Sequence, residues 1–169
     1  NLVRSVRPMT VRRAHQARDA LMLAVLASHP IRLANFAALS LGHNLIPTET
    51  GYTLHLGEDE TKEHRPYTTT VDENLVPYLD HYIDVVRPFL LKEKSTDQLW
   101  VSMRGTGVSD STVHYQINKI TKKLIGHAIN PHLIRDCVMT SLANNRPEQV
   151  LAGARLLGHN SLGTSEKHY

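Results

Sequence analysis

The sequence predicts an α+β fold that is mostly helical and carries a small three-stranded antiparallel sheet. Apolar residues recur at helical spacing over most of the 169 residues. Alternating or β-branched residues are confined to three short segments, 52–56, 66–71 and 98–101. Because the first two lie close together early in the chain, they favour a small antiparallel sheet inserted among helices.

Capping residues and prolines indicate where the first helices begin. Thr10 is a suitable N-cap for a helix over residues 11–28. Pro30 suits the first turn of a second helix over residues 30–39, which is expected to end before Gly42.

The next segment predicts a β-hairpin. Residues 52–56 alternate in polarity and residues 66–71 are rich in β-branched side chains. The polar residues 57–63 between them are typical of a turn. Lys62 therefore lies near the tip of the hairpin or on its second arm.

The rest of the chain is predicted to be helical apart from one short strand. Ser109 caps one helix, whereas Pro131 and Pro147 begin two others. The expected elements are a helix from the Asp72 cap to about residue 87 that ends at Pro88, a strand over 98–101, helices over 110–125, 131–144 and 147–157, and a last helical turn over 164–169.

Composition indicates one globular domain over residues 1–169. Hydrophobic residues make up 41% and charged residues 21% of the chain, and no apolar run approaches the ~18 residues of a membrane span. The single cysteine, Cys137, excludes an internal disulfide and is expected to be a buried, inert thiol. This fits a reducing, cytoplasmic interior. The eleven histidines show no metal-binding spacing such as His-Glu-x-x-His, so neither a metal nor another cofactor is predicted.

The charge of the chain is unevenly distributed. The net charge is +3, and residues 1–18 contain five arginines and no acid. Lys119, Lys122 and Lys123 form a second basic group, whereas acids gather at 58–63 and 72–84. A basic surface for nucleic acid and an ordinary solvated face remain equally compatible with this pattern.

Six residues suit chemistry on a phosphodiester. Arg32 lies within an apolar helical face, and His132 and Arg135 share the first turn of a helix, where an anion is favoured. Attack by a phenol on a phosphodiester requires neutralisation of charge, an acid for the leaving group and removal of the phenol proton. The candidates are Arg32, Lys62, His132, Arg135, His159 and Tyr169. Taken singly, each also fits a solvated surface residue or a helix cap.

In order and spacing, these residues resemble the catalytic domain of the tyrosine recombinases, the phage integrase family. The resemblance covers essentially the whole chain. The segments that carry it are Ser28-His29-Pro30-Ile31-Arg32-Leu33-Ala34-Asn35, Thr61-Lys62, His132-Leu133-Ile134-Arg135-Asp136, and Leu156-Leu157-Gly158-His159 through Tyr169.

The resemblance implies a site-specific recombinase or integrase that cleaves and rejoins double-stranded DNA. Arg32 and Arg135 would bind the scissile phosphate, His132 and His159 would donate hydrogen bonds to it, and His132 would help to accept the tyrosine proton. Lys62 would protonate the departing 5′-hydroxyl, and Tyr169 would form a 3′-phosphotyrosyl ester. No ATP or metal is implied. A non-catalytic DNA-binding module of the same fold and an enzyme like a type IB topoisomerase or telomere resolvase remain the alternatives.

The sequence departs from the family pattern at several positions. Asn35 replaces a residue that is usually acidic, and Asp136 one that is often histidine. The family usually has a tail after the tyrosine and an N-terminal DNA-clamping domain, so the chain is expected to be a fragment of a protein that forms a tetramer on DNA. The implied location is the bacterial or phage-host cytoplasm, at the nucleoid. The predicted helix over 110–125 is a candidate for groove contacts through His114, Gln116, Asn118 and Lys119.

Overall fold

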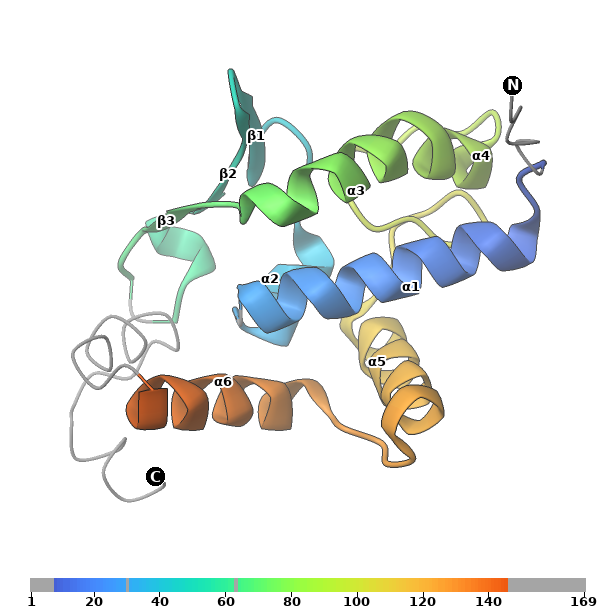
Figure 1. The fold of residues 1–169 in the computed structure, drawn as a ribbon. Helices are drawn as coiled ribbons and strands as arrows, with labels where there is room; N and C mark the ends of the chain where they lie inside the picture. The colour runs from blue at the N-terminus through green and yellow to red at the C-terminus, as the bar shows by residue number, and fades with distance from the viewer. Residues whose placement is uncertain (1–7, 30, 63, 146–169) are drawn as a thin grey trace, which may run out of the picture.

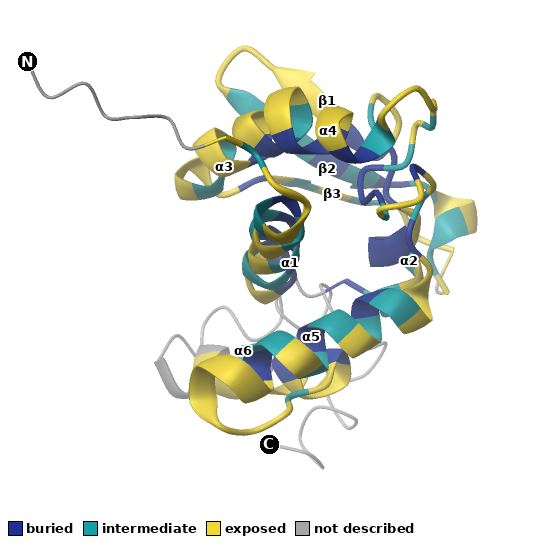
Figure 2. Ribbon diagram, turned by 90° about the vertical axis from the view of Figure 1, so that its right-hand side faces the viewer, coloured by how far each residue is buried: buried dark blue, intermediate teal, exposed yellow. Residues whose placement is uncertain are grey.

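Helix α1 (Val11–Ser28) is the central element of the fold. The computed structural model describes residues 8–29, 31–62 and 64–145. In two perpendicular views, α3 and α4 lie on one side of α1, and α5 and α6 lie on the other (Figures 1 and 2). The helix begins as the sequence predicts, because the Thr10 side chain accepts a hydrogen bond from the Arg13 amide at 3.3 Å. Its buried face carries Ala14, Leu21, Met22, Val25 and Leu26.

Helix α2 (Leu33–Ala38) is shorter than the prediction of 30–39. The Ile31 amide donates to the His29 carbonyl at 2.7 Å, so the backbone turns before the helix begins. Arg32 then adopts an extended backbone (ψ 141°) and serves as the N-cap. The helix therefore begins immediately after Arg32 rather than before it.

The sheet is three-stranded and antiparallel, as predicted, but one of its strands differs from the prediction. Its strands are β1 (Leu45–Thr48), β2 (Gly51–Leu56) and β3 (Tyr67–Thr70), in the order β1-β2-β3. The predicted hairpin is the β2–β3 pair. The third strand is β1 and not residues 98–101, which form only isolated bridges at Gln98 and Val101.

Residues 96–101 are held by three side chains in addition to backbone bonds with Leu39, Leu41 and Val108. The Tyr82 hydroxyl donates to the Leu99 carbonyl at 3.0 Å and accepts from the Val101 amide at 3.1 Å. The buried Arg18 guanidinium donates to the Val101 carbonyl at 2.8 Å. Arg87 donates to the carbonyls of Thr96 and Gln98. The backbone bonds of Leu99 to Leu39 and of Leu41 to Asp97 form only the isolated bridge of Ser40 with Gln98, so the segment adds no strand to the sheet.

The helix predicted to end at Pro88 continues past it. The observed elements are the 3-10 helix η2 (Glu73–Leu75), α3 (Val76–His81), a π-helical turn η3 (Tyr82–Val86) and α4 (Arg87–Leu91). Within this continuous helical segment (residues 73–91), the Arg87 amide donates to the Tyr82 carbonyl, five residues back. The wider turn lets Pro88 stand at the beginning of a renewed α-helix, where its missing amide hydrogen costs little.

Helices α5 (Asp110–Ile125) and α6 (Pro131–Asn145) agree with the predicted segments. Ser109 caps α5 through the Thr112 amide at 3.2 Å, and Gly126 ends it with a left-handed backbone (φ 80°). Cys137 on α6 is exposed, so the prediction of a buried thiol was wrong. The helices predicted over 147–157 and 164–169 lie outside the described residues.

Trp100 lies at the centre of the core. Its side chain is fully buried, with the Phe36 ring stacked at 5.2 Å and the Tyr82 ring tilted at 5.5 Å between centroids. These contacts join α2, the π-helical turn and the 96–101 segment. None of the described helices combines the length and apolar character needed to cross a bilayer.

The Tyr82 hydroxyl is expected to contribute strongly to stability. In Tyr82→Phe the ring still packs on Trp100, but two buried backbone groups lose a partner, at a cost of about 1–3 kcal/mol. Urea unfolding measures this. Tyr78→Phe is the matched control, because Tyr78 lies in the same helical segment but is 66% exposed. It should change stability by less than about 0.5 kcal/mol. Equal stability of the two variants would contradict this role.

His29 is expected to make stability depend on pH. Burial lowers the pKa of His29 below its usual 6.5, although the nearby Asp72 carboxylate partly opposes the shift. The unfolded chain therefore binds a proton that the folded chain does not, and stability falls as pH drops below 6.5. Unfolding free energies measured at several pH values should fall less steeply in His29→Gln than in the exposed-residue control His81→Gln. An unchanged slope in His29→Gln would refute the assignment.

Candidate active site

Arg32 is held at the start of α2 by the core. Its carbonyl accepts the Phe36 amide at 2.9 Å, and the Phe36 ring stacks on Trp100. The Arg32 side chain is half-buried. The aromatic core therefore fixes the backbone of Arg32 at the start of α2.

Lys62 lies in the connection between β2 and β3, as the sequence predicts, and its side chain is exposed. The connection begins with the 3-10 helix η1 (Glu58–Glu60). Beyond it, the Thr61 hydroxyl donates to the Arg65 carbonyl at 2.7 Å and accepts the Arg65 amide at 3.0 Å. The backbone is thus held on both sides of Lys62.

A hydrogen bond joins the Arg32 and Lys62 segments. The side-chain amide of Asn35, one turn after Arg32, donates to the Glu60 backbone carbonyl at 2.8 Å. Glu60 stands two residues before Lys62. The structure therefore brings together the two segments that carry these candidates, which are far apart in the sequence.

His132 and Arg135 share the first turns of α6. The Asn130 side chain accepts the Leu133 amide at 2.9 Å and so caps this helix. His132 is exposed and Arg135 is half-buried, whereas Ile134 between them lies in the core. Because α6 packs against α1 and α5, both polar side chains are carried on an anchored helix. His159 and Tyr169 lie outside the described residues.

Two polar residues near the candidates are not predicted as site residues from the sequence. Glu60 and the buried Asn44 bond to each other at 2.8 Å beside the Lys62 segment. A sequence signal existed for Glu60, since it stands three residues after Gly57, the spacing of a helix-capping glutamate. Asn44 had none, because its partners are distant in the sequence.

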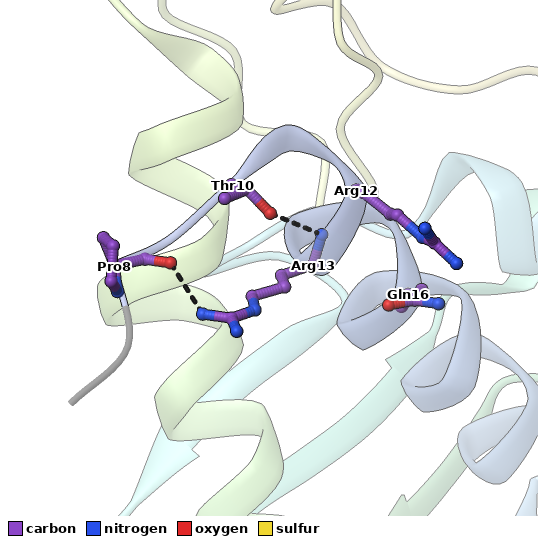
Figure 3. A pocket seen from close by; sticks show the side chains of 5 residues that line it. All are labelled: Pro8, Thr10, Arg12, Arg13 and Gln16. Carbon is purple, nitrogen blue, oxygen red and sulfur yellow. Dashed lines mark hydrogen bonds between the residues drawn. The ribbon is translucent and has the colours of Figure 1, made fainter. Parts of the chain in front are cut away.

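Basic side chains occupy two parts of the surface. Figure 3 shows Arg12 and Arg13 beside an open hollow at the start of α1, where Arg13 donates to the Pro8 carbonyl at 2.9 Å. On α5, the Lys119 ammonium lies 5.9 Å from the centre of the exposed Tyr115 ring. Arg18 does not belong to this surface, because it is buried and paired with Asp19 at 2.7 Å.

Metal-binding geometry is not seen in this part of the chain. Among the described residues, no group of three or more histidine, cysteine, aspartate or glutamate side chains is arranged to hold an ion. The candidates instead offer two guanidinium groups, an ammonium and imidazoles, which are suited to an anionic substrate.

Comparison with known proteins identifies relatives in sequence. Residues 6–169 match the model of the phage integrase family. The tyrosine recombinase XerD of Staphylococcus epidermidis is 30% identical over 151 residues, which cover 88% of this chain and 48% of the relative. XerD of Staphylococcus saprophyticus is 29% identical with the same coverage. The chain thus spans about half the length of the curated relatives that it matches.

Solved structures share the fold at lower sequence identity. The XerH site-specific recombinase bound to its difH substrate, in a pre-cleavage complex, has a TM-score of 0.72 at 18% identity. This match covers 96% of the chain and 44% of XerH. The XerA recombinase has a TM-score of 0.67 at 18% identity, over 96% of this chain and 60% of XerA.

The family model extends over nearly the whole chain, and the matched relatives named here are tyrosine recombinases. The helical architecture and the small antiparallel sheet agree with the solved structures. On these grounds the chain belongs to the phage integrase family.

Proposed function

We propose that residues 1–169 form the catalytic domain of a site-specific recombinase, which cleaves and rejoins double-stranded DNA through a covalent 3′-phosphotyrosyl intermediate. The observation that carries the proposal is the Asn35–Glu60 hydrogen bond. It joins the segment of a phosphate-binding arginine to that of a proton-donating lysine, in a chain of the phage integrase family.

The first step would be attack by the Tyr169 oxygen on the scissile phosphorus. The bond from phosphorus to the 5′-oxygen breaks, and Lys62 supplies the proton that this oxygen needs to leave as a hydroxyl. His132 accepts the tyrosine proton. The DNA then remains attached to the enzyme through its 3′-phosphate.

Arg32 and Arg135 would stabilise the charge that develops on the phosphate oxygens. Two planar guanidinium groups provide directed N–H donors for this purpose. His159 adds a further hydrogen bond. A 5′-hydroxyl from a second strand reverses the attack and releases Tyr169, and since the ester retains the bond energy, religation needs no ATP.

DNA is the proposed partner, and α5 is a proposed contact. Lys119 lies over the exposed Tyr115 ring, so the helix offers a cation and an aromatic surface together. The working assembly would be a tetramer of the longer protein on DNA, in the cytoplasm at the nucleoid.

Tyr169→Phe should abolish covalent attachment while the fold and DNA binding persist. The purified chain is incubated with sheared, nicked genomic DNA from the organism that encodes it, and adducts are resolved on a denaturing gel. Sequencing of the attached DNA then identifies the site. Tyr78→Phe, which alters an exposed tyrosine on α3, is the control and should retain adducts.

Three outcomes would overturn this proposal. An adduct that survives Tyr169→Phe removes the assigned nucleophile, and DNA binding without any adduct indicates a non-catalytic module. Adducts without a preferred sequence, accompanied by relaxation of supercoiled plasmid, would instead identify a type IB topoisomerase activity.

Arg135→Ala and Lys119→Ala are expected to separate catalysis from binding. Loss of Arg135 should slow cleavage at the recovered site by about 100-fold or more and weaken DNA binding only modestly. Loss of Lys119 should weaken binding at all sequences and reduce the slope of log K against log salt by about one. Fluorescence anisotropy and single-turnover cleavage measure the two effects. Equal losses in both assays for Arg135→Ala would mean that it is only a phosphate anchor.

A further inference from the structure

We propose that Asn35 and Glu60 are positioning residues for Lys62, and that they fix the lysine segment (residues 57–62) to α2 before DNA arrives. The inference rests on the proposed function, since it assigns both residues to the step that protonates the leaving group. Neither residue needs to touch DNA for this role.

The primary connection is between a side chain on α2 and the backbone of the lysine segment. The Asn35 amide donates to the Glu60 carbonyl at 2.8 Å. Asn35 lies one turn from Arg32, and Glu60 lies two residues from Lys62. A movement of the lysine segment relative to Arg32 must therefore break this bond.

The Glu60 carboxylate provides the second connection. One oxygen accepts the Gly57 amide at 2.7 Å, and the other accepts the Asn44 side chain at 2.8 Å. Asn44 is 2% exposed and also bonds to Ser40 and to the His55 carbonyl. The carboxylate thus binds the first residue of its own segment, directly after β2, and ties the segment to a buried side-chain amide beside β1.

The environment of Glu60 favours its charged form. Burial alone raises the pKa of this carboxyl, but hydrogen bonds from Gly57 and Asn44 and the imidazoles of His43 and His55 outweigh that effect and lower the pKa below 4.5. His43 lies 3.6 Å from the carboxylate. The hydrogen bonds of the Glu60 carboxylate should therefore persist at neutral pH and be lost only in acid.

Lys62 combines this fixed backbone with an exposed side chain, whose ammonium can reach a bound ligand. Its side chain is exposed, while the bonds of Glu60 and Thr61 hold the adjacent backbone. Proton transfer in the transition state depends on placement, and a displacement of about 1 Å can cost about 100-fold in rate. Loosening the segment should therefore impair the proton donor without altering the phosphate-binding groups.

The side-chain amide of Asn35 is the required chemical group. A carboxylate at this position cannot donate a hydrogen bond, and its charge would face the Glu60 carbonyl oxygen. Asn35→Asp, although nearly isosteric, should therefore be at least as harmful as Asn35→Ala. This follows from the local geometry even though the position is usually acidic in the family.

The test uses a leaving group that needs no proton. Single-turnover cleavage is measured on the genomic site recovered above, once with an ordinary phosphodiester and once with sulfur replacing the bridging 5′-oxygen. A thiolate leaves unprotonated far more readily than an alkoxide. The variants are Asn35→Ala, Asn35→Asp and Glu60→Ala, with Lys62→Ala as the reference and Asn74→Ala, an exposed asparagine outside the contacts of Glu60, as the matched control.

The three variants should slow cleavage of the ordinary substrate by about 10- to 100-fold and cleave the sulfur substrate within about threefold of wild type. Lys62→Ala should behave likewise, and Asn74→Ala should resemble wild type on both. Hydrogen exchange of the peptide spanning residues 57–62 should become faster in the three variants, whereas urea unfolding remains cooperative.

Equal slowing on both substrates, or unchanged hydrogen exchange of residues 57–62, would overturn the positioning role. Unimpaired cleavage of the ordinary substrate by the three variants would do the same. These outcomes differ from failure of the proposed function itself, in which wild type forms no adduct on either substrate. They also differ from a Lys62→Ala defect that sulfur does not rescue, which would remove Lys62 as the acid.

Discussion

The structure depends on the anchoring of Trp100 and the segment that carries it. Residues 96–101 make no continuous strand, yet Arg18, Tyr82 and Arg87 bind several of their carbonyls and the Val101 amide. Backbone groups of Leu39, Leu41 and Val108 bind others. An arginine buried without such partners would be costly, and so would an unpaired buried peptide group. Here the buried guanidinium groups and the buried peptide groups satisfy each other's hydrogen bonds. The indole is thereby fixed between the rings of Phe36 and Tyr82.

The candidate site is built outward from this core. Phe36 stacks on Trp100 and belongs to α2, so the position of the indole sets the position of Arg32 at the helix start. Asn35 on the same short helix extends the connection to Glu60 and the Lys62 segment. A helix of six residues is marginal by itself, and its packing rather than its propensity makes it a stable platform.

The other half of the site has a separate anchor. α6 packs against α1 and α5, and its capped first turn carries His132 and Arg135 on either side of the buried Ile134. The central helix α1 thus contacts α6 and also leads, through the turn at His29, into Arg32. The segments that carry Arg32 and those that carry His132 and Arg135 thus pack on one hydrophobic core, which is compatible with the proposed site.

By itself, the sequence determined the α+β class, the caps of α1 and α5, the β2–β3 hairpin with Lys62 between its strands, and the family, because local capping, periodicity and residue spacing carry that information. Tertiary structure alone decided that residues 98–101 form no strand, that the helix continues past Pro88 and that α2 begins after Arg32. It also decided that Asn35 binds Glu60. These outcomes depend on partners distant in sequence, which supply or withhold hydrogen bonds that no local pattern specifies.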